Sequence, residues 1–264
     1  MKFFIPFLAL IVPAAADSLR TASVTAATNE VQIYPGSSAS HHASIGEKVA
    51  MPSSVQTGRN SRTELTFNDS TITRLGQNSV FSFREGGRNV ELKQGSVLLQ
   101  VPKNAGGATI RTATVTAAIT GTTVMFEYSP GKSIKLLTLE GTQKLSINGS
   151  KTSVAVPAGQ MIIMPPNATV IPQPVTINIA KLVATSPLAG KGTFEPLPSQ
   201  AREFIQQTIG DQMLAKRQGV LLPTNFIISG AGNWSSRGIQ NSAQDNLATS
   251  PNSEGTYPSP IRNP

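Results

Sequence analysis

Residues 124–139 read VMFEYSPGKSIKLLTL and hold the two longest segments of a pattern that runs from Thr57 to Pro166. In this pattern, short stretches with alternating apolar residues end in glycine turns, roughly ten residues apart. Ser133–Leu139 is apolar on both faces, which predicts a strand in the centre of a sheet rather than at its edge. Short strands between regular turns indicate an all-β domain built as a stack of strands.

The alternation also predicts which side chains face the core. In Thr63–Phe67, Leu65 and Phe67 would point inward, while Glu64 and Thr66 would point outward.

A hairpin is predicted further along the chain. The dipeptide Asn148-Gly149 separates the apolar segments Lys144–Ile147 and Thr152–Val156, which favours a two-residue turn between paired strands.

After Pro174 the spacing of apolar residues changes to that of helices. A short helix is expected within Thr176–Thr185. Ser199 would cap a second helix that runs to Gln218 and buries Ile205, Ile209 and Met213. Both helices would pack on the β domain; a partner-binding amphipathic helix is the alternative.

The N-terminal residues MKFFIPFLALIVPAAA have the pattern of a secretory signal peptide, and cleavage after Ala26 or Ala27 is an alternative to cleavage after Ala16. No later segment is apolar enough to span a membrane. We therefore expect an exported protein in the periplasm, at the cell surface or outside the cell. The chain has no cysteine, which excludes disulfides and thiolate chemistry.

These patterns divide the chain into five segments. They are a signal peptide (1–16), a linker with one possible strand at Val31–Tyr34 (17–45), the β domain (46–172), a short helical extension (173–222) and a disordered tail that includes Trp234 (223–264).

The chain is basic, with 22 Lys and Arg against 14 Asp and Glu, yet charged residues make up only 14% of it. The positive charges are spread over the β domain. They fit either an ordinary solvated surface or a basic face toward an anionic polymer. Export makes nucleic acid an unexpected partner, and no feature of the sequence sets the oligomeric state.

A search for a chemical site gives little. His41 and His42 lie in a loop without a recognisable third metal ligand, and the Asp69 turn offers one carboxylate, too few for calcium. Glu127 and Glu140 could form the carboxylate pair of a glycoside hydrolase only if the fold brought them together at a cleft. We predict no catalytic, cofactor-binding or metal-binding residue.

Short motifs in the β domain resemble those of the FecR family of bacterial envelope proteins. They are VQTG (55–58), SR (61–62), LTF (65–67), RLG (74–76), VEL (90–92), IRT (110–112), AAITGT (117–122) and LEG (139–141). Ser70 departs from the family pattern, which has glycine there, and this suggests a different turn. The motif positions expected to be structural are Gly58, Arg62, Leu65, Phe67, Gly76, Gly95, Gly121, Thr122 and Gly141.

The resemblance implies a β-roll or β-helix-like domain without catalytic residues. Better-studied family members are inner-membrane regulators that meet an outer-membrane iron-siderophore transporter and control a sigma factor. We identify no cytoplasmic segment or membrane helix here, so only the interaction role of the domain is expected.

The leading hypothesis is a non-enzymatic, exported FecR-domain protein that binds an envelope protein or an anionic envelope polymer, with a link to envelope signalling or iron-uptake regulation. It would use a rigid β surface or an exposed edge strand. The arginines that could add anionic contacts, or serve the structure, are Arg62, Arg74, Arg84, Arg88 and Arg111. The alternatives are a structural component of an extracellular layer and a polysaccharide-active enzyme.

Overall fold

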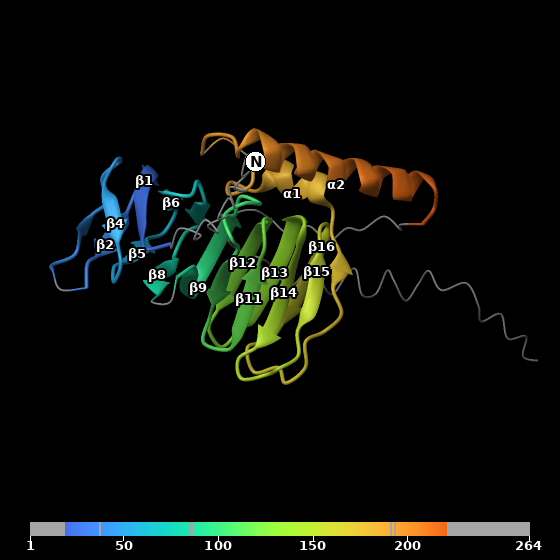
Figure 1. The fold of residues 1–264 in the computed structure, drawn as a ribbon, viewed down its shortest axis with the longest axis horizontal. Helices are drawn as coiled ribbons and strands as arrows, with labels where there is room; N and C mark the ends of the chain where they lie inside the picture. Colours follow the sequence, from blue (N-terminus) through green and yellow to red (C-terminus); the bar gives the residue numbers. More distant parts are fainter. Residues whose placement is uncertain (1–18, 37, 85–86, 191, 193, 221–264) are drawn as a thin grey trace, which may run out of the picture.

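The computed structural model describes residues 19–36, 38–84, 87–190, 192 and 194–220 (Figure 1). The predicted signal peptide, the predicted tail and Trp234 lie outside these residues. The described residues form mostly strands, with two helices, α1 (Ile179–Thr185) and α2 (Ser199–Arg217). The strands are β1 (Thr21–Thr28), β2 (Val31–Tyr34), β3 (His41–His42), β4 (Lys48–Ala50), β5 (Ser54–Thr57), β6 (Arg62–Phe67), β7 (Ile72–Leu75), β8 (Val80–Arg84), β9 (Asn89–Gln100), β10 (Ala108–Arg111), β11 (Val115–Ile119), β12 (Thr123–Ser129), β13 (Ser133–Glu140), β14 (Thr142–Ile147), β15 (Val154–Pro157), β16 (Gln160–Met164) and β17 (Val175–Thr176).

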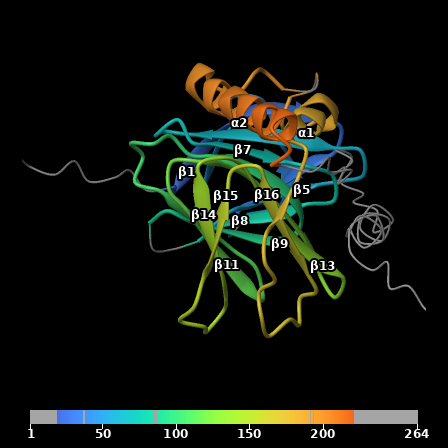
Figure 2. The ribbon, with the colours of Figure 1, turned by 90° about the vertical axis from the view of Figure 1, so that its right-hand side faces the viewer.

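The strands form two layers that share β9. The first layer, sheet A, has the order β4-β1-β6-β7-β9-β12-β13-β16-β17. The second, sheet B, has the order β3-β2-β5-β8-β9-β10-β11-β14-β15. Figure 2 shows the helices over one end of this arrangement. The prediction of an all-β stack of short strands is confirmed. The β-helix-like alternative is not observed. A β-helix is built from parallel strand pairs, and among the described strand pairs only β9–β10 is parallel.

The main core lies between the two sheets. The inward positions of both layers alternate with outward ones, as the pleat of a strand requires. Leu65 and Phe67 belong to this core, as predicted, and the ring of Phe67 meets Phe83 edge-on at 5.6 Å. The core also contains Phe81, Leu92 and many other fully buried side chains from the central strands.

A second apolar layer lies on the outer face of sheet A, where helices α1 and α2 pack (Figure 1). Leu137 and Leu139 of β13 face these helices, while Ile134 and Leu136 face the main core. The prediction that Ser133–Leu139 is a central strand with two buried faces is therefore confirmed. Within the described residues, neither helix is long and apolar enough to cross a membrane.

Helix α2 buries less than its sequence predicts. Ile205 and Ile209 pack on sheet A, but Met213 is 52% exposed, so the prediction that it is buried is wrong. In Figure 1 the C-terminal turns of α2 extend past β16, which leaves no sheet beneath them. Ser199 is the first helical residue rather than the cap, because Pro198 holds the N-cap position and makes no side-chain hydrogen bond there.

The segment 17–45, expected to be a linker with one strand, is part of both sheets. β1 is eight residues long and pairs with β4 and β6, and β2 pairs with β5. The sequence did not predict β1, because the alternation of its buried residues is weak. Ala22 and Val24 are buried, and their neighbours are serine and threonine. His41 and His42 form the short strand β3 rather than a mobile loop.

The Asn148-Gly149 turn forms, with the Ser150 amide donating to the Ile147 carbonyl, but the two-residue hairpin does not. The pairing of β14 with β15 begins at Leu145 and Val154 and ends at Thr142 and Pro157, so residues 146–153 stay outside it. The end of β14 stays bonded to β11 instead, and the amide of Asn148 donates to the carbonyl of Thr114.

Candidate interaction surface

The outer face of sheet B is open, whereas helices cover part of the outer face of sheet A. In the described part of the chain, both helices pack against sheet A and none covers sheet B. Laterally paired residues cross this face in rows, because registered neighbours on adjacent strands point to the same side. One row holds Ser54, Ser82, Glu91, Arg111, Thr116 and Ser146, and the next holds Arg84, Asn89, Thr109, Ala118, Lys144 and Ala155.

Two cations on this face are available to a partner. Arg111 and Lys144 are exposed, and neither forms a hydrogen bond or ion pair with another described side chain. Arg84 differs, because its Nη1 donates to Glu91 Oε2 at 2.9 Å. The face is therefore polar and basic around β10, β11 and β14.

A shallow groove of about 250 Å³ lies beside Arg111. Thr109, Thr116 and Ser146 line it, together with the turn that carries Asn148. The turn is fixed, since Thr116 Oγ1 donates to Asn148 Oδ1 at 2.7 Å and Asn148 Nδ2 donates to the Thr112 carbonyl at 3.1 Å. The groove offers one guanidinium and several hydroxyl groups to an anionic group.

Arg74, predicted as a possible anionic contact, is buried and serves the fold. Its Nε donates to Glu64 Oε2 at 2.7 Å, and its Nη1 and Nη2 donate to the carbonyls of Leu188 and Glu195. Its guanidinium also lies 4.9 Å from the centre of the Phe194 ring. Glu64 does point away from the core, as predicted, but it is buried, and its carboxylate accepts from Arg74 and Thr25.

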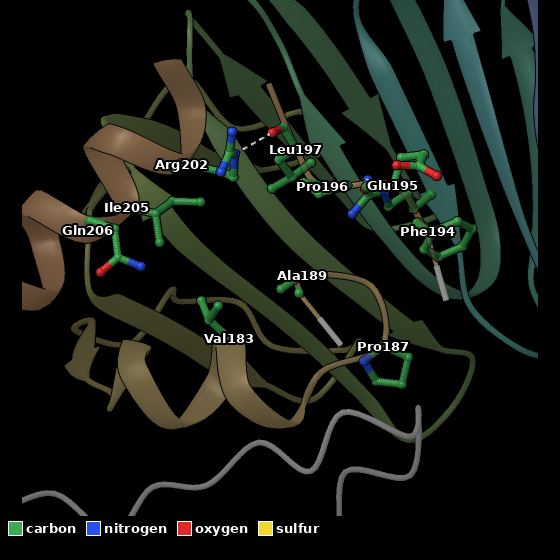
Figure 3. Close-up of a pocket in the computed structure, with 12 residues that line it drawn as sticks. Val183, Pro187, Ala189, Phe194, Glu195, Pro196, Leu197, Arg202, Ile205 and Gln206 are labelled. Atoms are coloured by element: carbon green, nitrogen blue, oxygen red, sulfur yellow. Dashed lines mark hydrogen bonds between the residues drawn. The ribbon is translucent and has the colours of Figure 1, made fainter. Parts of the chain in front are cut away.

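That segment and the two helices enclose a cavity of about 250 Å³ (Figure 3). The labelled side chains Val183, Pro187, Phe194 and Ile205 give it an apolar wall. Arg202 is held at its edge, where Nε donates to the Leu197 carbonyl at 2.9 Å. The cavity can accept a small apolar group, whereas an extended charged polymer cannot enter it.

The remaining arginines also have defined positions. Arg88 pairs with Asp69 and donates to the Gly107 carbonyl, which ties two turns together. Asp69 in addition accepts the Thr71 amide at 2.9 Å. Arg62 is half-buried on β6.

In the described residues no three His, Asp or Glu side chains gather as metal ligands would.

Glu127 and Glu140 do not form a facing pair. Glu127 lies opposite Lys135, and Glu140 lies opposite Thr123, four residues away along β12, roughly 13 Å at the rise of a strand. Burial raises the pKa of Glu127 to about 7 against the opposing effect of Lys135, and burial also raises the pKa of Glu140. Each carboxylate thus has its own environment on the outer face of sheet A.

The two histidines lie on exposed strand β3. His41 Nε2 is 2.6 Å from Glu47 Oε1, and this hydrogen bond raises the pKa of His41. The ring of His42 lies within hydrogen-bonding distance of Gln32 Nε2.

The family-motif positions occupy the core and the tight turns. Leu65, Phe67 and Thr122 are buried. A Cβ at Gly121, where φ is +60°, would lie 2.7 Å from the Lys103 Cα, and one at Gly141 would lie 2.5 Å from the Thr122 Cγ2. The other members of the set show a similar pattern: Gly58, Gly76 and Gly95 pass close to neighbouring residues, and Arg62 lies on β6. Their roles as purely structural positions stay a prediction.

Lys144 was not singled out from the sequence. The signal was present, because Lys144 alternates with Gln143 and Leu145, which are buried in β14. What could not be read locally is that β14 pairs with β11 and brings Lys144 to the same face as Arg111.

Comparison with known proteins identifies the central region. Residues 53–142 match the model of the FecR family, described as FecR protein. No curated protein matches the chain.

Among the solved structures that are similar, two carry the description of a candidate anti-sigma factor from Parabacteroides distasonis ATCC 8503. One is 12% identical, with a TM-score of 0.42, over 49% of this chain and 63% of the solved one. The other is 14% identical, with a TM-score of 0.43, over 74% of this chain and 92% of the solved one.

Proposed function

We propose that the protein is a non-enzymatic binding module of the bacterial envelope, a role that the match of residues 53–142 to the FecR family model supports. The open face of sheet B is its binding surface, and the partner is an acidic envelope protein or an anionic envelope polymer. The observation that carries the proposal is that both described helices pack on the outer face of sheet A and not on the outer face of sheet B. Helices cover the part of sheet A formed by β9, β12, β13 and β16, whereas sheet B presents Arg111 and Lys144 in rows of small polar side chains.

Export is part of the proposal. The signal pattern of residues 1–16 supports it, as does the position of β1. Cleavage after Ala16 leaves β1 and the buried Leu19 whole, whereas cleavage after Ala26 would remove most of a strand that pairs with β4 and β6. Placement in envelope signalling or iron-uptake regulation belongs to the same proposal, and the FecR match supports it.

A charge-reversal experiment tests the surface. The double variant Arg111→Glu with Lys144→Glu should lose binding to immobilised polygalacturonate, polyglutamate or envelope extract by tenfold or more, since each exposed charge contact contributes up to about 1 kcal/mol. Wild-type binding should weaken as salt is added. Retention on polygalacturonate but not on polyglutamate would assign the polymer, and the reverse would assign an acidic protein.

The matched control carries the same charge change on the helical side. Lys181→Glu with Arg217→Glu alters two exposed cations of α1 and α2 and should bind as the wild type does. Equal binding by both double variants, or no binding of wild type to any of the three materials at low salt, would contradict the proposal.

A further inference from the structure

A polar cavity of about 250 Å³ lies apart from the sheet B surface, where β9 bends and the β12–β13 turn meets the turn before β8. The residues that line it include Asn78, Gln94, Ser96, Glu127, Ser129 and Lys132. Its volume approaches the lower end of the range for small-ligand sites, about 300–1,000 Å³.

Glu127 is the unusual member of this cavity, because it is 5% exposed and only half satisfied. Oε1 accepts from Lys135 Nζ at 3.4 Å, a long hydrogen bond. Oε2 is buried without a hydrogen-bond donor among the described residues. A buried carboxylate oxygen without a donor is costly, so a donor from a ligand would stabilise it.

The cavity is built on rigid backbone. Glu127 lies directly opposite Ser96 in the β9–β12 ladder, and the Ser96 amide donates to Ser79 Oγ at 3.0 Å. Gln94 Nε2 donates to the Asn78 carbonyl at 3.2 Å. These bonds fix the backbone at Glu127 and Ser96 and the side chain of Gln94 before any ligand arrives.

The charges around the cavity select against an ionic ligand. Lys135 faces Glu127 from β13, and Lys132 stands on the adjoining turn. A cation would meet both lysines, and an anion would meet the ionised form of Glu127. Because burial raises the pKa of Glu127 to about 7, both its protonated and ionised forms are present near neutral pH. Such a group accepts and donates hydrogen bonds.

We propose that this cavity binds a neutral polyhydroxy ligand, one sugar unit, with a hydroxyl group that donates to Glu127 Oε2. The hydroxyl of Ser96 and the amides of Asn78 and Gln94 supply the remaining polar contacts. The site does not use Arg111 or Lys144, so it stands or fails separately from the sheet B surface.

The test is a titration of the ¹⁵N-labelled protein with glucose, galactose, mannose and N-acetylglucosamine, each into the millimolar range, followed by amide chemical shifts. At least one sugar should give saturable shifts that centre on the amides of Gly95, Ser96 and the β12–β13 turn at residues 127–129 and 131–132. Gln94→Ala, at an exposed position, should weaken that binding about tenfold, the effect of losing one polar contact with the ligand. Glu127→Gln should also weaken it, while Glu140→Gln, a buried carboxylate on the same face but outside the cavity, should not.

A second readout follows the Glu127 carboxyl group by ¹³C chemical shift. A hydroxyl that donates to the ionised form lowers the pKa of a carboxyl group, so saturating sugar should move the Glu127 pKa downward and leave that of Glu140 in place. The proposal is overturned if no sugar gives saturable shifts at the cavity, if ethylamine binds there and the sugars do not, or if Gln94→Ala and Glu127→Gln bind as tightly as wild type.

Discussion

Gly95 is the residue that allows one strand to serve both sheets. On its N-terminal side β9 pairs with β8 and β10, and on its C-terminal side β9 pairs with β7 and β12. Its φ of +93° is strained for any residue with a side chain, and a Cβ there would collide with the backbone of Ser79. The bend therefore depends on glycine in two ways.

Gly95→Ala should lower the free energy of unfolding by about 2–4 kcal/mol, because backbone strain and collision add. Urea denaturation measures the loss. Gly131→Ala is the matched control, since Gly131 also has a positive φ of +71° but open space at the Cβ position, and it should cost about 1 kcal/mol. Equal losses in the two variants would show that the contact with Ser79 does not matter.

The same residue scale shows what local sequence can and cannot predict. Alternation places Leu65 and Phe67 in the core correctly, because the pleat is a local property. It could not show that Arg74 is buried, since that side chain donates to carbonyls 114 and 121 positions away, whereas Arg111 has no such partner among the described residues.

At the scale of elements, the segment between α1 and α2 is fixed to sheet A by a buried ion pair. Arg74 joins Glu64 on the neighbouring strand to the carbonyls of Leu188 and Glu195. The helices complete the layer by covering Leu137 and Met161. One guanidinium thus couples the β stack to its helical cover.

Removal of one partner from a buried pair leaves an uncompensated charge, so Arg74→Met should destabilise the protein by about 3–5 kcal/mol. Arg84→Met, which breaks the exposed pair with Glu91, should cost no more than about 1 kcal/mol. Thermal or urea unfolding of the two variants checks this. A loss of under 1 kcal/mol for Arg74→Met would refute the view that this pair fixes the cover.

Elements were predictable where the apolar alternation is strong and missed where it is weak. β12, β13 and β16 follow from their sequences, as does α1. β1 was missed because its two buried residues, Ala22 and Val24, stand among serine and threonine and give a weak apolar alternation. The β14–β15 connection is longer than the Asn148-Gly149 motif predicts, because the end of β14 is hydrogen-bonded to β11. A local sequence motif cannot show that long-range pairing.

At the scale of the whole molecule, the two sheets differ in what lies on their outer faces. Sheet A carries an apolar cluster and both described helices on the outer face of β9, β12, β13 and β16, while sheet B carries small polar residues and the exposed cations Arg111 and Lys144. The sequence indicated a basic β domain, but the sidedness of its charge arises only when the strands are paired in register. This asymmetry is the basis for assigning binding to sheet B.

A site-specific photo-crosslinker tests that assignment most directly. Benzoylphenylalanine would replace Ala118, an exposed residue paired with Lys144 on sheet B, or Gln207, an exposed residue of α2, in cells that express the full chain. The account predicts crosslinked envelope partners from position 118 and none from position 207. Crosslinks from position 207 with none from position 118 would contradict it.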